Sequence, residues 1–399
     1  MPGRKFSILL VSHSYPPVLG GSEVEAQRVC AALLRRGHRV QVVCAGGPPM
    51  PESPVWVDPY GVPVRMFGGS VPDRWRDRAF AAGVVRMLVK ERGRIDLVYF
   101  LMQGLHLATG LPVARYFGIP VVMKFSGSSI ISMLRESRLG RLELRWLQAW
   151  AKRVMVLNEG MKQEAMAAGF RRDHLLWMPN PVDVQEYAPC SDSQKSALRA
   201  ELAVDEDAYV IVFVGRLAPE KELRSLIGAF GHVVRQFPQA KLVLIGDGSE
   251  RSMLEESAGR DPSIGSSIRF TGRLSADRVR KWLQASDVFA LVSSQEGFPC
   301  SLVEAMSAGL PSVVSDIPAN RQLIFSGENG FTAELKNEEA LGSALTCLAA
   351  DSGLRLRLGA AARAHVTANY STDKVAERYE TLFAESVEPR GNSCHSYSG

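Results

Sequence analysis

The sequence lacks any long uninterrupted run of hydrophobic residues. A membrane-spanning helix needs roughly 18 of them, and no stretch of these 399 residues reaches that length. The first residues have a basic start and a short apolar run, which ends at His13, Pro16 and Pro17. No small-x-small cleavage motif follows, so the pattern favours a first buried strand over a signal peptide. We expect a cytoplasmic protein, either free or peripheral on the cytosolic face of a membrane.

Cysteine is scarce, and its spacing excludes the common metal sites. The six cysteines form no CxxC pair and have no histidine at metal-ligand spacing. Reduced, buried thiols are their expected state in the cytosol. The string Asp205-Glu206-Asp207 matches a D-x-D metal motif, but it precedes a predicted strand and so lies at the wrong end of a sheet for a ligand site. We therefore expect no metal, no cofactor, and activity that survives a chelator.

Neither sign of charge dominates the whole chain, but the two halves differ. Residues 1–180 hold 25 Lys and Arg against 13 Asp and Glu, a net of +12, and residues 181–399 hold 22 against 29, a net of −7. A basic first half indicates an anionic partner for that half only. Aromatic residues are few, at 8%, and the basic residues do not alternate with them in any recognisable nucleic-acid-binding module. Nucleic acid is not an expected partner.

Short apolar segments, in contrast, are frequent and alternate with helical patterns. Strands such as FSILLVS and YVIVFVG are followed by Gly-containing loops and then by stretches with apolar residues at helical spacing. This alternation indicates a parallel sheet covered on both faces, and it occurs twice, so we predict two doubly wound α/β domains. The predicted boundaries are a first domain at 1–182, a second at 183–368, a C-terminal helix at 369–386 that returns to the first domain, and a disordered tail at 387–399.

Ligands of such sheets bind at the carboxyl ends of the strands, so the loops that follow the strands are the candidate sites. In the first loop, Gly20 and Gly21 let backbone amides approach a ligand closely, and Ser22 and Glu25 fit an S-x-x-E capping box. A phosphate-cradling loop and a simple capped turn both remain open here. The later stretch GDGSER lacks the third glycine of the dinucleotide fingerprint, so we interpret it as a turn and helix cap.

Two cations follow the strand YVIVFVG. Arg216 and Lys221 bracket a turn and the start of a predicted helix. The helix dipole and the free amides at such a helix start attract an anion. A solvated surface pair is the alternative interpretation.

Residues 293–309, SSQEGFPCSLVEAMSAG, combine a predicted helix start with two carboxylates. Gly297 lets the chain pass close to a ligand, and Pro299 suits the first position of a helix, where its missing N–H costs nothing. The first backbone amides of that helix should then be unpaired and point at a ligand. These amides belong to Cys300, Ser301 and Leu302.

The two carboxylates lie on either side of this helix start. Glu296 precedes the helix, and Glu304 is on it, roughly 7–8 Å along its axis. A diphosphate at the helix start, with Arg216 and Lys221 beside it, would repel both acids, so they must hold hydroxyl groups. A sugar on one side of the diphosphate and a ribose on the other would supply those hydroxyls.

The order of these motifs, a G-G loop, then G-R-L-x-x-x-K, then E-G-F-P-x-x-x-x-E-A-M-x-x-G, resembles the retaining glycosyltransferases of family 4. The resemblance extends to about Glu385. It implies the GT-B fold, an α/β architecture of two Rossmann-like doubly wound domains facing across a cleft. The first domain would bind the acceptor and the second a nucleotide-sugar donor, with UDP as the most frequent nucleotide in the family. The implied activity is that of a hexosyltransferase.

The resemblance also implies roles for individual residues. Glu296 would contact the hydroxyls of the donor sugar and Glu304 the ribose, while Arg216 and Lys221 would hold the diphosphate and stabilise the leaving group. Glu296, Arg216 and Lys221 are the expected catalytic residues. The full set expected to bind the donor is Gly20, Gly21, Arg216, Lys221, Arg273, Leu274, Glu296, Gly297, Phe298, Pro299, Cys300, Ser301, Leu302 and Glu304.

The match fails at one position. Many members of the family carry a histidine in a T-x-H-G-like setting, where this chain has VVMKFSGSS and places Ser126. A serine cannot act as a general base near pH 7 as imidazole can, so that role does not transfer. In a retaining reaction the leaving diphosphate can accept the proton instead. His13, His106, Lys124 and Ser126 are the acceptor-side candidates, and for His106 and Lys124 a structural role is the stronger alternative.

The stretch 131–153 mixes leucine and tryptophan with basic residues. It has two interpretations: an amphipathic helix on an anionic membrane surface, or a core helix with a solvated basic face.

The expected function is transfer of a sugar, with retention, to a lipid-linked, glycan or small-molecule acceptor in cell-surface polysaccharide or glycolipid synthesis. A GT-B-fold nucleotide-sugar hydrolase or epimerase, and a non-catalytic nucleotide-sugar-binding protein, are the alternatives.

Overall fold

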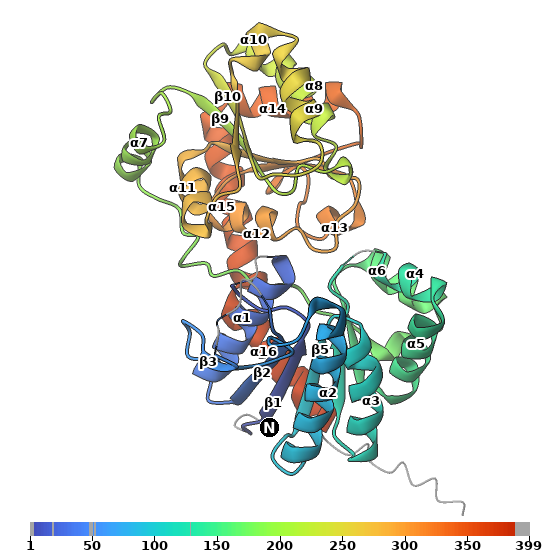
Figure 1. Ribbon diagram of the computed structural model, residues 1–399. Coiled ribbons are helices and arrows are strands. Elements are labelled where there is room, and N and C mark those ends of the chain that lie inside the picture. The colour runs from blue at the N-terminus through green and yellow to red at the C-terminus, as the bar shows by residue number, and fades with distance from the viewer. Residues whose placement is uncertain (1–3, 18–19, 48–50, 52, 128, 388–399) are drawn as a thin grey trace, which may run out of the picture. The chain divides into compact units, whose positions relative to one another are not determined.

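The computed structural model describes residues 4–17, 20–47, 51, 53–127 and 129–387. The chain divides into two compact units, each with its own sheet (Figure 1). The first unit comprises Met1–Leu157, Met161–Pro179 and Asp373–Gly399, and the second comprises Asn158–Gly160 and Asn180–Thr372. The chain thus crosses between the units a few residues from the boundaries expected at 182 and 368. The expected tail at 387–399 lies outside the described residues, apart from Val387.

The first unit contains a sheet in the order β3-β4-β2-β1-β5-β6-β7-β8. Its strands pair in parallel except β3 with β4. Central strands such as β5 are buried along their whole length, which explains their continuous apolar sequence. The strands are β1 (Ser7–Ser12), β2 (Arg39–Ala45), β3 (Val55–Val57), β4 (Pro63–Phe67), β5 (Leu97–Leu101), β6 (Val121–Lys124), β7 (Arg153–Val156) and β8 (Leu175–Trp177).

Helices on both faces cover this sheet, including the last helix of the chain. That helix, α16, packs Tyr379, Leu382 and Phe383 into the same core as β1, β2 and β5, and Figure 1 shows it in red among the blue strands of the first unit. The helices are α1 (Gly21–Arg35), α2 (Asp73–Glu91), α3 (Leu105–Tyr116), α4 (Ile130–Glu136), α5 (Arg138–Trp150), α6 (Glu159–Ala167), the 3-10 helix η1 (Arg172–His174) and α16 (Thr372–Val387).

The second unit contains a fully parallel sheet in the order β11-β10-β9-β12-β13-β14. The strands are β9 (Tyr209–Val214), β10 (Ala240–Ile245), β11 (Ile268–Gly272), β12 (Val288–Leu291), β13 (Ser312–Ser315) and β14 (Gly330–Ala333). The helices are α7 (Asp192–Glu201), η2 (Pro219–Lys221), α8 (Leu223–Gln236), α9 (Arg251–Gly259), α10 (Pro262–Gly265), α11 (Ala276–Ala285), α12 (Cys300–Ser307), α13 (Pro318–Arg321), α14 (Glu338–Ala350) and α15 (Ser352–Tyr370).

The two sheets, parallel apart from the pairing of β3 with β4, confirm the predicted α/β class with two doubly wound domains. The C-terminal helix, expected from residue 369, begins instead at Thr372, because α15 continues to Tyr370. Within the described ranges, none of the helices combines the length and the apolar character needed to cross a bilayer.

Candidate functional site

The carboxyl edge of the second sheet brings Lys221 and Glu296 together. Lys221 ends η2, in the loop after β9, and Glu296 lies in the loop after β12. The Lys221 ammonium donates to Glu296 Oε1 at 2.6 Å, and the Ser293 hydroxyl donates to the same oxygen at 2.7 Å. Both charged side chains are mostly buried, at 13% and 11% exposed. This edge therefore holds a cation and a carboxylate in fixed geometry. They lie in the loops that follow two adjacent strands, β9 and β12.

A network of hydrogen bonds holds the loop that carries Glu296. The amide of Ser294 donates to the carbonyl of Glu220 at 2.8 Å, which ties the loop to η2. The Ser315 hydroxyl, at the end of β13, donates to the carbonyl of Ser293 at 2.5 Å. Asn158, a residue of the second unit, donates to the carbonyl of Gly297 at 2.7 Å. These bonds preorganise the carboxylate, as a binding site requires.

Sequence reasoning missed the supporting residues Ser293, Asn158 and Ser315. Ser293 lies two residues after the end of β12, and Ser315 is the last residue of β13, so a search for polar residues at strand ends would have found both. Asn158 lies two residues after the end of β7, so the same search would have found it. Its partners could not have been predicted, because its contacts with residues 296–297 join positions 138 and 139 residues apart.

The start of α12 differs from the prediction. Pro299 is the N-cap residue, and the helix begins at Cys300. The Cys300 amide donates to the carbonyl of Phe298 at 3.0 Å, and the Leu302 amide donates to that of Pro299 at 3.0 Å. The prediction that these two amides are unpaired is therefore wrong. Local turn bonds satisfy them, and a diphosphate would have to compete with those bonds.

The remaining expected donor residues of the second unit lie at or near the same edge. Arg216 is 74% exposed and donates to Glu220 at 2.7 Å, and such an exposed pair contributes little to stability. Arg273 is exposed and follows β11. The others are the half-buried Leu274, Gly297, Ser301 and Glu304 and the buried Phe298.

The GDGSER stretch forms a turn, as expected, and Glu250 is the N-cap residue of α9, but no side chain caps that helix. The glycines of the stretch have a packing role. A Cβ atom on Gly246 would lie 1.8 Å from the carbonyl oxygen of Gly215, and one on Gly248 would lie 2.3 Å from that of Leu217. The amide of Leu217 donates to the carbonyl of Asp247 at 3.0 Å. These glycines let the loop after β10 pack against the loop that carries Arg216.

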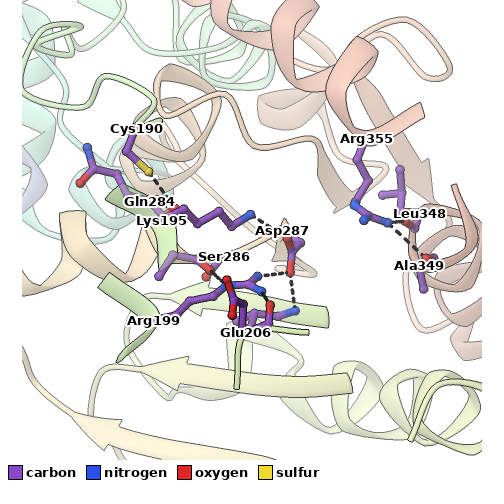
Figure 2. A network of polar contacts seen from close by, with 12 residues as sticks. Cys190, Lys195, Arg199, Glu206, Gln284, Ser286, Asp287, Leu348, Ala349 and Arg355 are labelled. Atoms are coloured by element: carbon purple, nitrogen blue, oxygen red, sulfur yellow. Dashed lines mark hydrogen bonds and ion pairs between the residues drawn. The ribbon is translucent and has the colours of Figure 1, made fainter. Parts of the chain in front are cut away.

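The D-x-D string lies at the opposite end of the second sheet, before β9. There the carbonyl of Glu206 accepts a hydrogen bond from Arg199 at 2.5 Å, and Arg199 and Lys195 both pair with Asp287 at 2.7 Å (Figure 2). The Asp287 carboxylate also accepts from the Val210 amide at 2.8 Å. This network joins α7 to the starts of β9 and β12. In the part of the chain that the structure describes, no group of three or more His, Cys, Asp or Glu is placed to hold a metal ion.

In the first unit, the expected capping box at the start of α1 is wrong. Gly20 is the N-cap residue, α1 begins at Gly21, and no side chain caps the helix. The Glu25 side chain is instead buried, where it forms an ion pair with Lys124 and accepts a hydrogen bond from the Tyr379 hydroxyl at 3.1 Å. Burial raises the pKa of the Glu25 carboxyl, and the nearby Lys124 opposes that rise.

This ion pair also decides the role of Lys124. The Lys124 side chain is fully buried at the end of β6, and its ammonium contacts Glu25 and, at 3.5 Å, the Tyr379 hydroxyl. A lysine in that position cannot reach an acceptor, so its assignment to the acceptor side is wrong. It joins β6 to α1 and α16 inside the core.

The two candidate histidines of the first unit are neighbours. His13 follows β1, is 46% exposed at its side chain, and lies 2.9 Å from Asp77. His106 is buried next to it, with ring centroids 6.3 Å apart. Burial, with a smaller effect of His13, lowers the pKa of His106 to about 4, so its ring stays neutral. Of the two, only His13 can meet a solvent-borne ligand, and Ser126 lies half-buried in the loop after β6.

Comparison with known families assigns both units. The family described as "Glycosyltransferase Family 4" matches residues 19–186, and that described as "Glycosyl transferases group 1" matches residues 194–365. A GDP-mannose-dependent alpha-mannosyltransferase of Mycolicibacterium smegmatis is 28% identical over 391 residues, 94% of this chain and 97% of that protein. The UDP-Gal:alpha-D-GlcNAc-diphosphoundecaprenol alpha-1,3-galactosyltransferase of Escherichia coli is 26% identical over 321 residues, 78% of this chain and 80% of that one.

Solved structures agree at the level of the fold. HepE of Anabaena, crystallised in complex with UDP, superposes with a TM-score of 0.76 at 21% identity and covers 95% of this chain and 99% of its own. Sucrose-phosphate synthase of Thermosynechococcus elongatus superposes with a TM-score of 0.78 at 19% identity, over 96% and 99% of the two chains.

Proposed function

The chain belongs to glycosyltransferase family 4 and has the GT-B fold, and from this we propose that it transfers a hexose from a nucleoside diphosphate sugar to an acceptor hydroxyl with retention of configuration. The observation that carries the proposal is the contact between Lys221 and Glu296 at the carboxyl edge of the second sheet. Binding a diphosphate beside a sugar requires a cation and a hydroxyl acceptor at neighbouring positions, and this pair supplies both.

In this mechanism, Lys221 and Arg216 bind the diphosphate and stabilise the negative charge that develops on it. Glu296 accepts hydrogen bonds from sugar hydroxyls, and Ser293 and Lys221 hold its carboxylate in place. The bond between the anomeric carbon and the phosphate oxygen breaks as the acceptor oxygen bonds to that carbon on the same face. The acceptor proton passes to the leaving diphosphate, so the reaction needs no base at Ser126.

We propose UDP as the nucleotide. The complex of HepE with UDP and the UDP-galactose named for the E. coli relative support it, while the mycobacterial relative is named for GDP-mannose. Thermal shift and slow donor hydrolysis with a panel of UDP- and GDP-sugars distinguish the two nucleotides.

For the acceptor, we propose a lipid-linked sugar and a role in cell-surface polysaccharide or glycolipid synthesis. The diphosphoundecaprenol in the name of the E. coli relative supports this proposal.

Replacing the carboxylate tests the proposed function directly. We expect Glu296→Ala to reduce turnover by about 10²-fold or more while donor binding is retained, and Glu339→Ala, at an exposed position of the same unit, to have no effect. Unchanged turnover in Glu296→Ala would contradict the site assignment. Sugar released to water, or a sugar with one carbon inverted, would instead support the alternative of a hydrolase or epimerase. Donor binding by the wild type without any turnover would support a non-catalytic nucleotide-sugar-binding protein.

We further propose that transfer needs no metal ion, since Lys221 and Arg216 supply the positive charge at the diphosphate. Turnover should persist in EDTA at the rate measured without it. Loss of turnover in EDTA, followed by recovery with Mg²⁺ or Mn²⁺, would contradict this.

We also propose that α5 contacts an anionic membrane surface at the cytosolic face. The helix buries Leu144 and Leu147 in the core, and its outer side exposes Leu139 and Leu142. The exposed arginines of that side are Arg138, Arg141 and Arg145. Leucine beside arginine on a solvent-facing side suits a lipid interface. Binding to anionic vesicles should weaken as salt rises, and binding that is absent or independent of salt would contradict the proposal.

A further inference from the structure

A cavity of about 470 Å³ opens in the first unit near the amino end of β6. It lies between the last turn of α3, the end of α5 and η1. Figure 1 shows α3 and α5 side by side, in agreement with their packing. The loops that carry His13 and Ser126 follow the carboxyl ends of their strands, so this cavity is separate from the acceptor-side candidates. Its volume falls within the range of small-molecule sites, roughly 300–1,000 Å³.

The polar side chains of the cavity are predominantly cationic. Arg115, Lys152 and Arg171 line it together with the polar Gln148 and His174, and none of its lining residues is Asp or Glu. The neighbouring Asp173 pairs with Arg171 through two hydrogen bonds, of 2.9 and 2.5 Å. That pair neutralises part of the charge of Arg171, and Arg115 and Lys152 add two further cations. The cavity therefore favours an anion.

The Arg115 cation also has a simpler explanation, because it lies in the last turn of α3, where it complements the helix dipole. Lys152 lies two residues beyond the end of α5. That explanation does not account for the apolar wall. Leu111, Ile119 and Trp150 line the same cavity. The Trp150 ring stacks on that of Trp146, with the two ring centroids 5.2 Å apart.

The cavity continues the exposed side of α5. A second hollow, lined by Arg138, Arg141, Leu142 and Arg145, lies along the same helix. These positions recur at intervals of three and four residues, as one face of a helix requires, and the helix then leads to Gln148, Trp150 and Lys152 in the larger cavity. One helix thus carries arginine and leucine along its outer side and a cationic, partly apolar cavity at its end.

We propose that this cavity binds the phosphate-bearing head group of an anionic lipid. Arg115, Lys152 and Arg171 make charge-assisted hydrogen bonds to the phosphate. The Trp150 ring and the aliphatic wall contact the adjoining glycerol and acyl carbons, where an aromatic ring with a polar edge is favoured. The apolar wall selects a lipid over free phosphate. The membrane contact proposed for α5 would bring such a lipid to the cavity, but the lipid site does not depend on sugar transfer.

The test is sedimentation with phosphatidylcholine vesicles that contain or lack phosphatidylglycerol. The cavity variant is Arg115→Gln/Lys152→Gln/Arg171→Gln, and the matched control is Arg74→Gln/Arg86→Gln/Lys90→Gln, which removes the same charge from exposed positions of α2. We expect the cavity variant to bind anionic vesicles about tenfold or more weakly than wild type and the control to bind within about twofold of wild type. Turnover on a soluble donor panel should be unchanged in both variants.

Equal losses in the two variants would overturn the proposal, since they would show a general effect of charge. Calorimetry with inorganic phosphate and with a water-soluble short-chain phosphatidic acid separates the two sources of phosphate. Tighter binding of the short-chain lipid, lost in the cavity variant, supports the proposal, and equal or stronger binding of phosphate overturns it. If circular dichroism shows that the triple variant does not fold, the double variant Arg115→Gln/Arg171→Gln takes its place. Both of its positions are exposed, and the expected results are the same. Loss of turnover in Glu296→Ala has no bearing on these results.

Discussion

At the scale of single residues, the carboxyl group of Glu143 links the stability of the first unit to pH. Its side chain is 2% exposed on α5, and burial raises its pKa from 4.5 to about 7, although a backbone hydrogen bond of Gly104 lowers it. The folded state therefore holds a proton that the unfolded state releases above pH 4.5. Its contribution to stability is complete below about pH 4.5 and is lost as pH rises to about 7.

Replacing Glu143 with glutamine should remove this pH dependence. Relative to wild type, the free energy of unfolding of Glu143→Gln should increase between about pH 5 and pH 8, by at most roughly 3 kcal/mol. Urea denaturation at both pH values measures it, with Glu136→Gln, at an exposed position of α4, as the control. Parallel pH dependences of wild type and Glu143→Gln would contradict the prediction.

Two similar tetrapeptides show what a local pattern does and does not predict at this scale. The stretch that starts at Ser191 forms a capping box, with 3.3 Å from the Gln194 amide to the Ser191 hydroxyl and 2.9 Å from the Ser191 amide to the Gln194 side chain. The one that starts at Ser22 does not, because Glu25 faces the core and pairs with Lys124, 99 residues away. Spacing predicts a cap only where the side chain stays at the surface. The Lys221 and Glu296 candidates were predictable because each follows a strand.

At the scale of elements, α16 contributes its apolar side to the core of the first unit. Val375, Tyr379 and Phe383 recur every four residues and are fully buried. Phe383→Ala should lower the free energy of unfolding by about 3–5 kcal/mol, because it leaves a cavity in a packed core. Thr381→Ala, exposed on the same helix, should change it by less than about 0.5 kcal/mol. Denaturant unfolding measures the free energy of unfolding of both variants. If Phe383→Ala changed it as little as Thr381→Ala, α16 would not be part of this core.

The elements also show where periodicity stops being informative. The strand expected at YVIVFVG is β9, because a fully buried parallel strand is apolar throughout. The break between α15 and α16 was misplaced, since it depends on a distant partner. Ser371 pairs with Val182, and the Val182 amide donates to the carbonyl of Tyr370 at 2.9 Å. The apolar periodicity of residues 369–386 does not indicate that contact, so it could not predict where the break lies.

At the scale of the whole molecule, the two units have separate sheets and separate ligands in the proposed function, so each can be perturbed alone. Chains of several domains commonly unfold in more than one transition. We expect two calorimetric transitions, and UDP should raise the temperature of only the one that belongs to the second unit. At a UDP concentration near 100 times Kd, the free energy of unfolding of that unit should increase by about 2.7 kcal/mol. Lys221→Met should abolish this shift.

The complementary variant assigns the other transition. Phe383→Ala changes only the first unit, so it should lower the transition that UDP leaves in place. A scan of this variant with UDP should therefore show the two transitions shifted in opposite directions. One transition that responds to both UDP and Phe383→Ala would contradict independent unfolding, because it would mean that ligand binding at Lys221 and packing of α16 stabilise a single cooperative unit. A shift with UDP that persists in Lys221→Met would place the nucleotide away from the edge that joins Lys221 to Glu296.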